Sequence, residues 1–128
     1  MSSLEDEATE QGNLLRDNGD FDGAIAAYTK AICMHPQNAE SYCSRAHAYM
    51  RKGDFDKAIA DCNMAIQLDP MMAEPYCWRG NCQGRKGDFD KAIADCAEAI
   101  RLDPHSAEAY HVRGVVSGLR GDFERAIA

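Results

Sequence analysis

The sequence lacks the features that would tie it to a membrane or to nucleic acid. Its apolar runs are a few residues long, whereas a membrane-spanning helix needs roughly 20. It has 14 Lys and Arg against 21 Asp and Glu, and this net charge of −7 argues against a surface for phosphate backbones. The acidic first residues, MSSLEDEATEQG, contain no apolar core of a signal peptide. We therefore expect neither a membrane nor a nucleic acid as partner.

Signatures of catalysis are also missing. The glycines are isolated, so there is no phosphate-binding loop, and the serines have no His and Asp at a fixed spacing. Paired acids such as Asp54/Asp56 and Asp88/Asp90 stand where helices are expected to start, and negative charge there suits the helix dipole. We expect a protein that is not an enzyme and needs no cofactor.

Four of the six cysteines lie at repeated places, because Cys43 and Cys77 are 34 residues apart and so are Cys62 and Cys96. A cysteine that recurs in this way reflects what one structural position accepts, not a disulfide framework. Together with the missing signal peptide, this predicts a reducing, cytoplasmic compartment.

The sequence does contain a repeat. The stretch GDFDKAIADCNMAIQLDP at 53–70 returns at 87–104 with three substitutions in eighteen positions. Gly-Asp-Phe occurs at 19, 53, 87 and 121, and the closing prolines stand at 36, 70 and 104, so both series step by 34 residues. A fixed period of this length marks a repeat array. We number each copy from 1 to 34, which gives one array over 1–128 with repeats at 5–38, 39–72 and 73–106 and a partial repeat at 107–128.

Each copy predicts two helices with a turn between them. In the second copy, helical spacing of apolar residues covers 39–52 and 55–68, and Gly53 is placed to end the first of these helices. Asn38, Asp54 and Ser106 stand where an N-cap is needed, whereas Met72 fills the same place with a poor cap. In the fourth copy, the same reasoning predicts that one helix ends at Gly121 and another starts at Asp122.

Small and large residues alternate where the helices must touch. Position 8 of the repeat is always small: Gly12, Ala46, Gly80 and Gly114. Positions 20 and 27 are always alanine: Ala24, Ala58, Ala92 and Ala126 at the first, and Ala31, Ala65 and Ala99 at the second. Position 4 is mostly tyrosine: Ala8, Tyr42, Tyr76 and Tyr110. This pattern, with proline at position 32, resembles the tetratricopeptide repeat over nearly the whole chain. The resemblance implies an all-α fold, a right-handed α-solenoid of helix-turn-helix repeats.

The resemblance also implies a function, a non-catalytic scaffold that binds a protein or peptide in a concave groove. That groove is lined by the first helix of each repeat, at positions that here hold Thr9, Asn13, Arg16, Cys43, His47, Met50, Arg51, Cys77, Asn81, Arg85 and His111. A subgroup of the family clamps the C-terminal carboxylate of chaperones, and the matching positions here are Thr9, Asn13, Ser44, Glu74 and Trp78. Only Asn13 agrees with that clamp, and Glu74 would repel a carboxylate, so we expect a different and more basic ligand.

Three further expectations concern particular side chains. Position 7 is Arg45 or Arg79 where position 23 is Asp61 or Asp95, which predicts two salt bridges between paired helices. Trp78 is expected to be partly exposed near the edge of the groove, either as an interface anchor or packed on the neighbouring repeat. A zinc site at Cys43, His47, Cys77 and His111 is a sharper alternative, but first helices about 8–10 Å apart would hold its ligands too widely, so no metal is predicted.

The end of the sequence gives the alternative function. Phe123, Ala126 and Ile127 would present apolar surface with no following element to cover them. We expect either that the sequence is the N-terminal part of a longer array or that a second copy covers this end, since such patches commonly mark association surfaces. The alternative to a peptide-binding scaffold is therefore a module that forms a homo-oligomer through its open C-terminal end.

Overall fold

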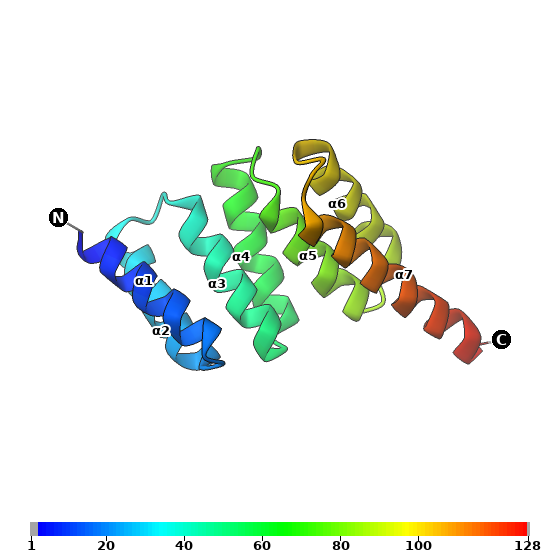
Figure 1. Cartoon of the computed structure of the whole chain (residues 1–128), viewed down its shortest axis with the longest axis horizontal. Helices are drawn as coiled ribbons and strands as arrows, with labels where there is room; N and C mark the ends of the chain where they lie inside the picture. Colours follow the sequence, from blue (N-terminus) through cyan, green and yellow to red (C-terminus); the bar gives the residue numbers. More distant parts are fainter. Residues whose placement is uncertain (1–2, 128) are drawn as a thin grey trace. The chain divides into compact units, whose positions relative to one another are not determined.

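The computed structural model describes residues 3–127, and the regular structure in that range is entirely helical. Its helices are α1 (Leu4–Asp17), α2 (Phe21–Met34), α3 (Ala39–Lys52), α4 (Phe55–Leu68), α5 (Glu74–Arg85), α6 (Phe89–Leu102) and α7 (Ala107–Ile127), coloured along the chain in Figure 1. The chain divides into two compact units, Met1–Pro70 and Met71–Ala128. The all-α repeat fold is therefore confirmed, whereas a single array over 1–128 stays a prediction.

The first unit consists of two helical hairpins. Helix α1 packs against α2 and α3 against α4, and the α2–α3 contact joins the two hairpins. Alanines at the repeated small positions are fully buried where these helices meet: Ala24, Ala31, Ala46, Ala58 and Ala65. Small side chains at a crossing let the two backbones approach closely, so the repeated alanines set how each hairpin closes.

Glycine ends the first helix of the hairpins in the way the sequence predicts. Gly19 and Gly53 have φ of +84° and +95° in the first unit, and Gly87 has φ of +89° in the second. Residues with a Cβ rarely adopt this left-handed conformation, so glycine is needed at each turn.

Capping residues start the next helices with varying success. The Asn38 side chain accepts a hydrogen bond from the Glu40 amide at 3.1 Å, and the Ser106 hydroxyl accepts one from the Ala109 amide at 3.1 Å. Asp54 stands at the N-cap of α4, but its side chain makes no capping bond. Helix α5 lacks a side-chain cap and has 12 residues where α3 has 14. The poor cap expected at Met72 thus coincides with a later helix start.

The second unit differs from the prediction. Helices α5 and α6 form a hairpin, and α7 packs against both. A break at Gly121 is wrong, because α7 runs without interruption from Ala107 to Ile127. In the other copies, the glycine turn leads into a second helix of 14 residues that packs along the first. Continuing the helix through Gly121 keeps backbone hydrogen bonds that a turn at this point would give up.

Among the described residues, none of the helices combines the length and apolar character needed to span a membrane.

Candidate functional site

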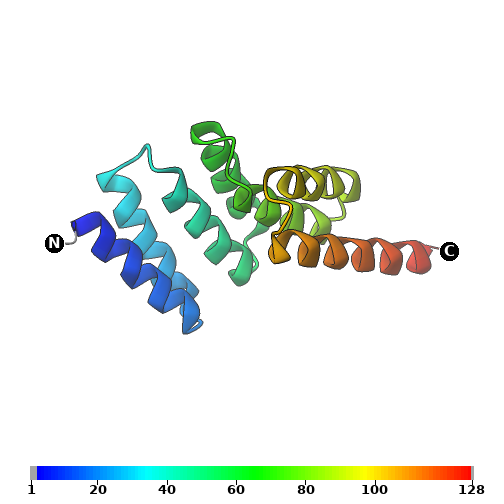
Figure 2. The ribbon, with the colours of Figure 1, turned by 45° about the horizontal axis from the view of Figure 1, so that its top comes forward.

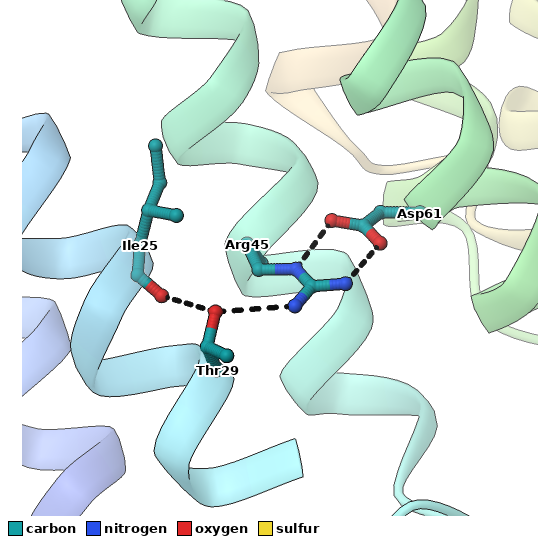
Figure 3. A network of polar contacts seen from close by, with 4 residues as sticks. All are labelled: Ile25, Thr29, Arg45 and Asp61. Atoms are coloured by element: carbon teal, nitrogen blue, oxygen red, sulfur yellow. Dashed lines mark hydrogen bonds and ion pairs between the residues drawn. The ribbon is translucent and has the colours of Figure 1, made fainter. Parts of the chain in front are cut away.

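Two charged side chains join the helices of the second hairpin (Figure 3). The Arg45 guanidinium donates to both carboxylate oxygens of Asp61, from Nε and from Nη2, each at 2.7 Å. Its Nη1 donates to the Thr29 hydroxyl of α2 at 3.1 Å, and that hydroxyl donates to the Ile25 carbonyl at 2.7 Å. The predicted Arg45–Asp61 bridge is confirmed. It also reaches back to the preceding repeat through Thr29.

The same bridge recurs in the second unit. Arg79 donates to Asp95 from Nε at 2.8 Å and from Nη2 at 2.7 Å, which confirms the second predicted pair. In the first repeat, Gln11 and Ala27 take these places, and the hairpin is held by a different bond. Fully buried Tyr28 donates its hydroxyl to Asn13 Oδ1 at 2.6 Å. Each hairpin thus has one polar link that fixes its first helix.

Helices α1 and α3 bring basic side chains near one another in the first unit. Arg16 on α1 and Arg51 on α3 both lie close enough to His47 to lower its pKa. Burial is the largest cause of that shift, and the pKa of His47 falls to about 4 although Asp17 opposes it. The imidazole is therefore neutral at pH 7 and offers hydrogen bonds, while the arginines supply the charge. We call Arg16, His47 and Arg51 the basic cluster.

Contacts with neighbouring side chains orient the two arginines. The Arg51 guanidinium lies over the Phe21 ring at 5.2 Å from its centroid, and Arg16 Nε is 3.6 Å from Asp17 Oδ1. Phe21 was not among the groove residues that the sequence predicted. A guanidinium over an aromatic face keeps its N–H edge available to a ligand.

The predicted groove residues of the first unit differ in exposure. Arg51 is exposed and Cys43 is buried, with 5% of its surface accessible. The others are half-buried: Thr9, Asn13, Arg16, His47 and Met50. The polar members therefore lie at the surface of α1 and α3, whereas the Cys43 thiol belongs to the packing.

The second unit shows the same division. Cys77 and Asn81 are buried, whereas Arg85 and His111 are exposed. Arg85 Nε donates to Asn81 Oδ1 at 2.8 Å, so the buried amide orients an exposed guanidinium. Burial raises the pKa of the Cys77 thiol to about 12, which keeps it protonated and makes it a poor metal ligand. Within residues 3–127, no three His, Cys, Asp or Glu side chains come together as a metal site would require.

Trp78 is not partly exposed, as the sequence suggested, but buried, with 8% of its surface accessible. Helix α5 packs against both α6 and α7, so more of its circumference is covered than the repeat pattern alone indicates. The indole therefore belongs to the core of the second unit.

Comparisons with known proteins agree with this architecture. Two sequence models of the tetratricopeptide repeat match residues 9–73 and 45–117, so the chain belongs to the tetratricopeptide repeat family. None of the curated proteins matches it.

Solved tetratricopeptide domains of similar structure include several that bind chaperone peptides. The first tetratricopeptide repeat domain of human RPAP3 is 29% identical, with a TM-score of 0.87, and the match covers 95% of this chain and 96% of that one. The first domain of Spaghetti (RPAP3), bound to the HSP90 peptide SRMEEVD, is 30% identical at a TM-score of 0.83, covering 92% and 94%. The TPR2B domain of yeast Sti1, in complex with an Hsp70 peptide, is 27% identical at 0.81, covering 98% and 99%.

Proposed function

We propose that the chain is a non-catalytic scaffold that binds an extended peptide along the exposed polar side chains of its first helices. The observation that carries this proposal is the basic cluster, in which Arg16, His47 and Arg51 from two helices share one locality. Guanidinium groups can hold peptide carbonyls and carboxylates, and a neutral imidazole adds a bond without charge. Peptide-bound relatives of similar fold support the same role.

We further propose that the ligand carries basic residues. The second position of every repeat is an exposed acid: Asp6, Glu40, Glu74 and Glu108. Exposed carboxylates of one sign attract lysine and arginine and repel acidic peptides. Glu74 also stands where the resemblance to carboxylate-clamp domains calls for a lysine. A tail such as SRMEEVD, which the Spaghetti domain binds, should therefore bind weakly here.

The test combines peptide selection with fluorescence anisotropy. Heptapeptides selected from a random library by the intact chain should be rich in Lys and Arg. Arg16, His47 and Arg51 should act through bonds to the peptide's carbonyl groups and C-terminal carboxylate, although the two arginines repel basic side chains. Changing all three to alanine should therefore lower the affinity at least about tenfold, or 1.4 kcal/mol. A matched control changes Lys30, His35 and Lys57, which are exposed basic side chains on other faces of the same unit. Equal losses in both triple variants, or no selected peptide at all, would contradict the proposal.

A single substitution tests the charge preference separately. The change Glu74→Lys should raise the affinity for SRMEEVD and lower it for the selected basic peptides, since it reverses one exposed charge. The change Glu10→Lys alters net charge equally at an exposed place of α1 outside the proposed positions and should have little effect. If SRMEEVD binds the unmodified chain more tightly than any basic peptide, the basic ligand is wrong even where peptide binding holds.

A further inference from the structure

The last turns of α7 carry an exposed stripe that nothing in the peptide-binding proposal uses. Arg120, Phe123, Glu124 and Ile127 follow one another at spacings of three, one and three residues, which places them on one face of the helix. Phe123 and Ile127 have 51% and 69% of their surface accessible. Figures 1 and 2 both show this end of α7 extending past α5 and α6. We call these four residues the α7 stripe.

The α7 stripe forms one wall of a hollow. It has a volume of about 530 Å³ and is formed by the first turn of α6 and the last turns of α7. Phe89 contributes an apolar wall, and its ring centroid is 5.6 Å from that of Phe123. Lys91, Asp88 and Asp90 add charges of both signs around it. The hollow therefore has an apolar wall and a mixed-charge rim, which suits a side chain from an amphipathic helix.

We propose that the α7 stripe pairs with the α7 stripe of a second copy of the chain, the two helices running antiparallel about a twofold axis. The stripe is self-complementary in charge. Arg120 and Glu124 lie one turn apart, so a twofold axis between them places Arg120 of each copy opposite Glu124 of the other copy. Within one copy, Arg120 Nε already donates to Glu124 Oε1 at 3.1 Å, and both side chains are exposed. Arg120 and Glu124 can therefore exchange their bond within one copy for bonds between two copies, with little loss of hydration.

Charge balance also separates a second copy from other occupants. A partner whose charges all have one sign, such as a basic peptide, would be attracted by Glu124 but repelled by Arg120. A second copy instead brings its own Phe123 beside this Phe123, which lies close to the twofold axis and next to Phe89. Two turns of helix per copy bury less than a standard interface of about 1,200 Å², so the dimer should be weak and should form at high concentration.

Salt should strengthen this dimer. Each copy has a net charge of −7, so two copies repel at long range. Screening reduces that repulsion more than it weakens apolar burial. A dimer held mainly by the charged pairs would show the opposite dependence on salt.

Sedimentation equilibrium of the intact chain, from about 10 µM to 1 mM, tests the proposal. The weight-average mass should rise toward that of a dimer and should stay at that of a monomer in the variant Phe123→Ser/Ile127→Ser. The matched control is Leu14→Ser, which removes a side chain of 64% exposure from the first unit and should leave the dimer intact. A monomer at every concentration, or a dimer insensitive to the double change, would overturn the proposal.

Charge reversal gives a second and independent measurement. Arg120→Glu alone and Glu124→Arg alone should each weaken dimerisation at least about tenfold, because each places like charges opposite one another. The combined variant Arg120→Glu/Glu124→Arg should restore it, since the stripe is again self-complementary. Failure of that restoration would contradict the antiparallel arrangement. So would backbone chemical shifts that place Gly121 in a left-handed turn, because Phe123 would then leave the stripe.

Discussion

The first two hairpins close at the same backbone geometry with different chemistry. In the α1–α2 hairpin, Tyr28 is fully buried and its ring fills the space above Gly12. In the α3–α4 hairpin, the corresponding residues are Cys62 and Ala46, and the ion pair of Arg45 and Asp61 lies beside them. The α1–α2 hairpin is therefore held by the large Tyr28 side chain packed over Gly12. The α3–α4 hairpin is held by small side chains and an ion pair.

This difference shows that tyrosine at position 24 needs glycine at position 8, whereas cysteine there accepts alanine, as with Ala46, or glycine, as with Gly80. A Cβ built on Gly12 would lie 2.6 Å from Cε1 of Tyr28, a distance that real contacts do not reach. The smaller Cys62 leaves room for the methyl group of Ala46, and both are fully buried. Substitutions can disrupt the packing of the α1–α2 hairpin, give it the residues of the α3–α4 hairpin, or remove the ion pair of the α3–α4 hairpin.

The largest effect should come from converting the first hairpin into the second. Gly12→Ala should cost about 2 kcal/mol through overpacking, and Tyr28→Cys about 3 kcal/mol through the cavity left by the ring. The double variant should cost less than the sum, because the alanine methyl enters the space that the ring vacates. Urea denaturation of the four proteins gives the coupling free energy. Simple additivity would show that the two positions are independent.

The charged link of the second hairpin should come next. Asp61→Ala leaves the largely buried Arg45 guanidinium without its carboxylate, and we expect a loss of about 2 kcal/mol, discounted for the partial exposure of Arg45. Arg45→Met/Asp61→Leu removes both charges and should be nearly neutral. Denaturation midpoints at low and high salt measure both effects. A double variant as unstable as Asp61→Ala would mean that the pair itself, not the stranded charge, stabilises the hairpin.

A smaller effect should separate the ring of Tyr28 from its hydroxyl. Tyr28→Phe keeps the packing against Gly12 but removes the bond to Asn13, so the expected loss is about 1 kcal/mol. Asn13→Ala should give a similar or larger loss, since it leaves the buried hydroxyl without its acceptor. If Tyr28→Phe leaves the free energy of unfolding unchanged, Tyr28 stabilises the hairpin through packing alone.

The sequence predicted these hairpins well because local rules govern them. The 34-residue period, the glycine turns and the Arg–Asp pairs all follow from residues that recur at fixed places. Gly121 defeated the same reasoning. Its triplet is identical to that of Gly53, yet Gly121 stays helical, so the triplet alone does not decide whether the chain turns.

The candidate site was less predictable from the sequence than the hairpins. Periodicity indicates which face of a helix a residue occupies, but not how much its neighbours cover it. Cys43, Cys77 and Asn81 were expected in the groove and are buried. Their neighbours Arg51, Arg85 and His111 are exposed, and only packing between helices distinguishes the two groups. Whether these residues bind a peptide stays a prediction.

The two hairpins also differ at position 9 of the repeat, which makes the stability of only one of them depend on pH. This is the smallest effect that we expect. Asn13 in the first hairpin does not titrate, whereas His47 in the second has a pKa of about 4, below the ordinary 6.5, through burial and the nearby Arg16 and Arg51. A depressed pKa means that the neutral form is favoured in the folded state. The contribution of His47 to stability is therefore complete above pH 6.5 and is lost as the pH falls toward 4.

His47→Asn gives the second hairpin the residue of the first and should flatten the dependence of stability on pH between 6.5 and 4. Urea midpoints at pH 7 and pH 5 measure the change, with the exposed His111→Asn as a matched control that should retain the slope. Proton NMR titration of the His47 ring gives its pKa directly. A midpoint near 6.5 would mean that water reaches the imidazole freely. His47 would then carry charge beside two arginines near neutral pH, and the basic cluster would bind acidic side chains more strongly as the pH falls.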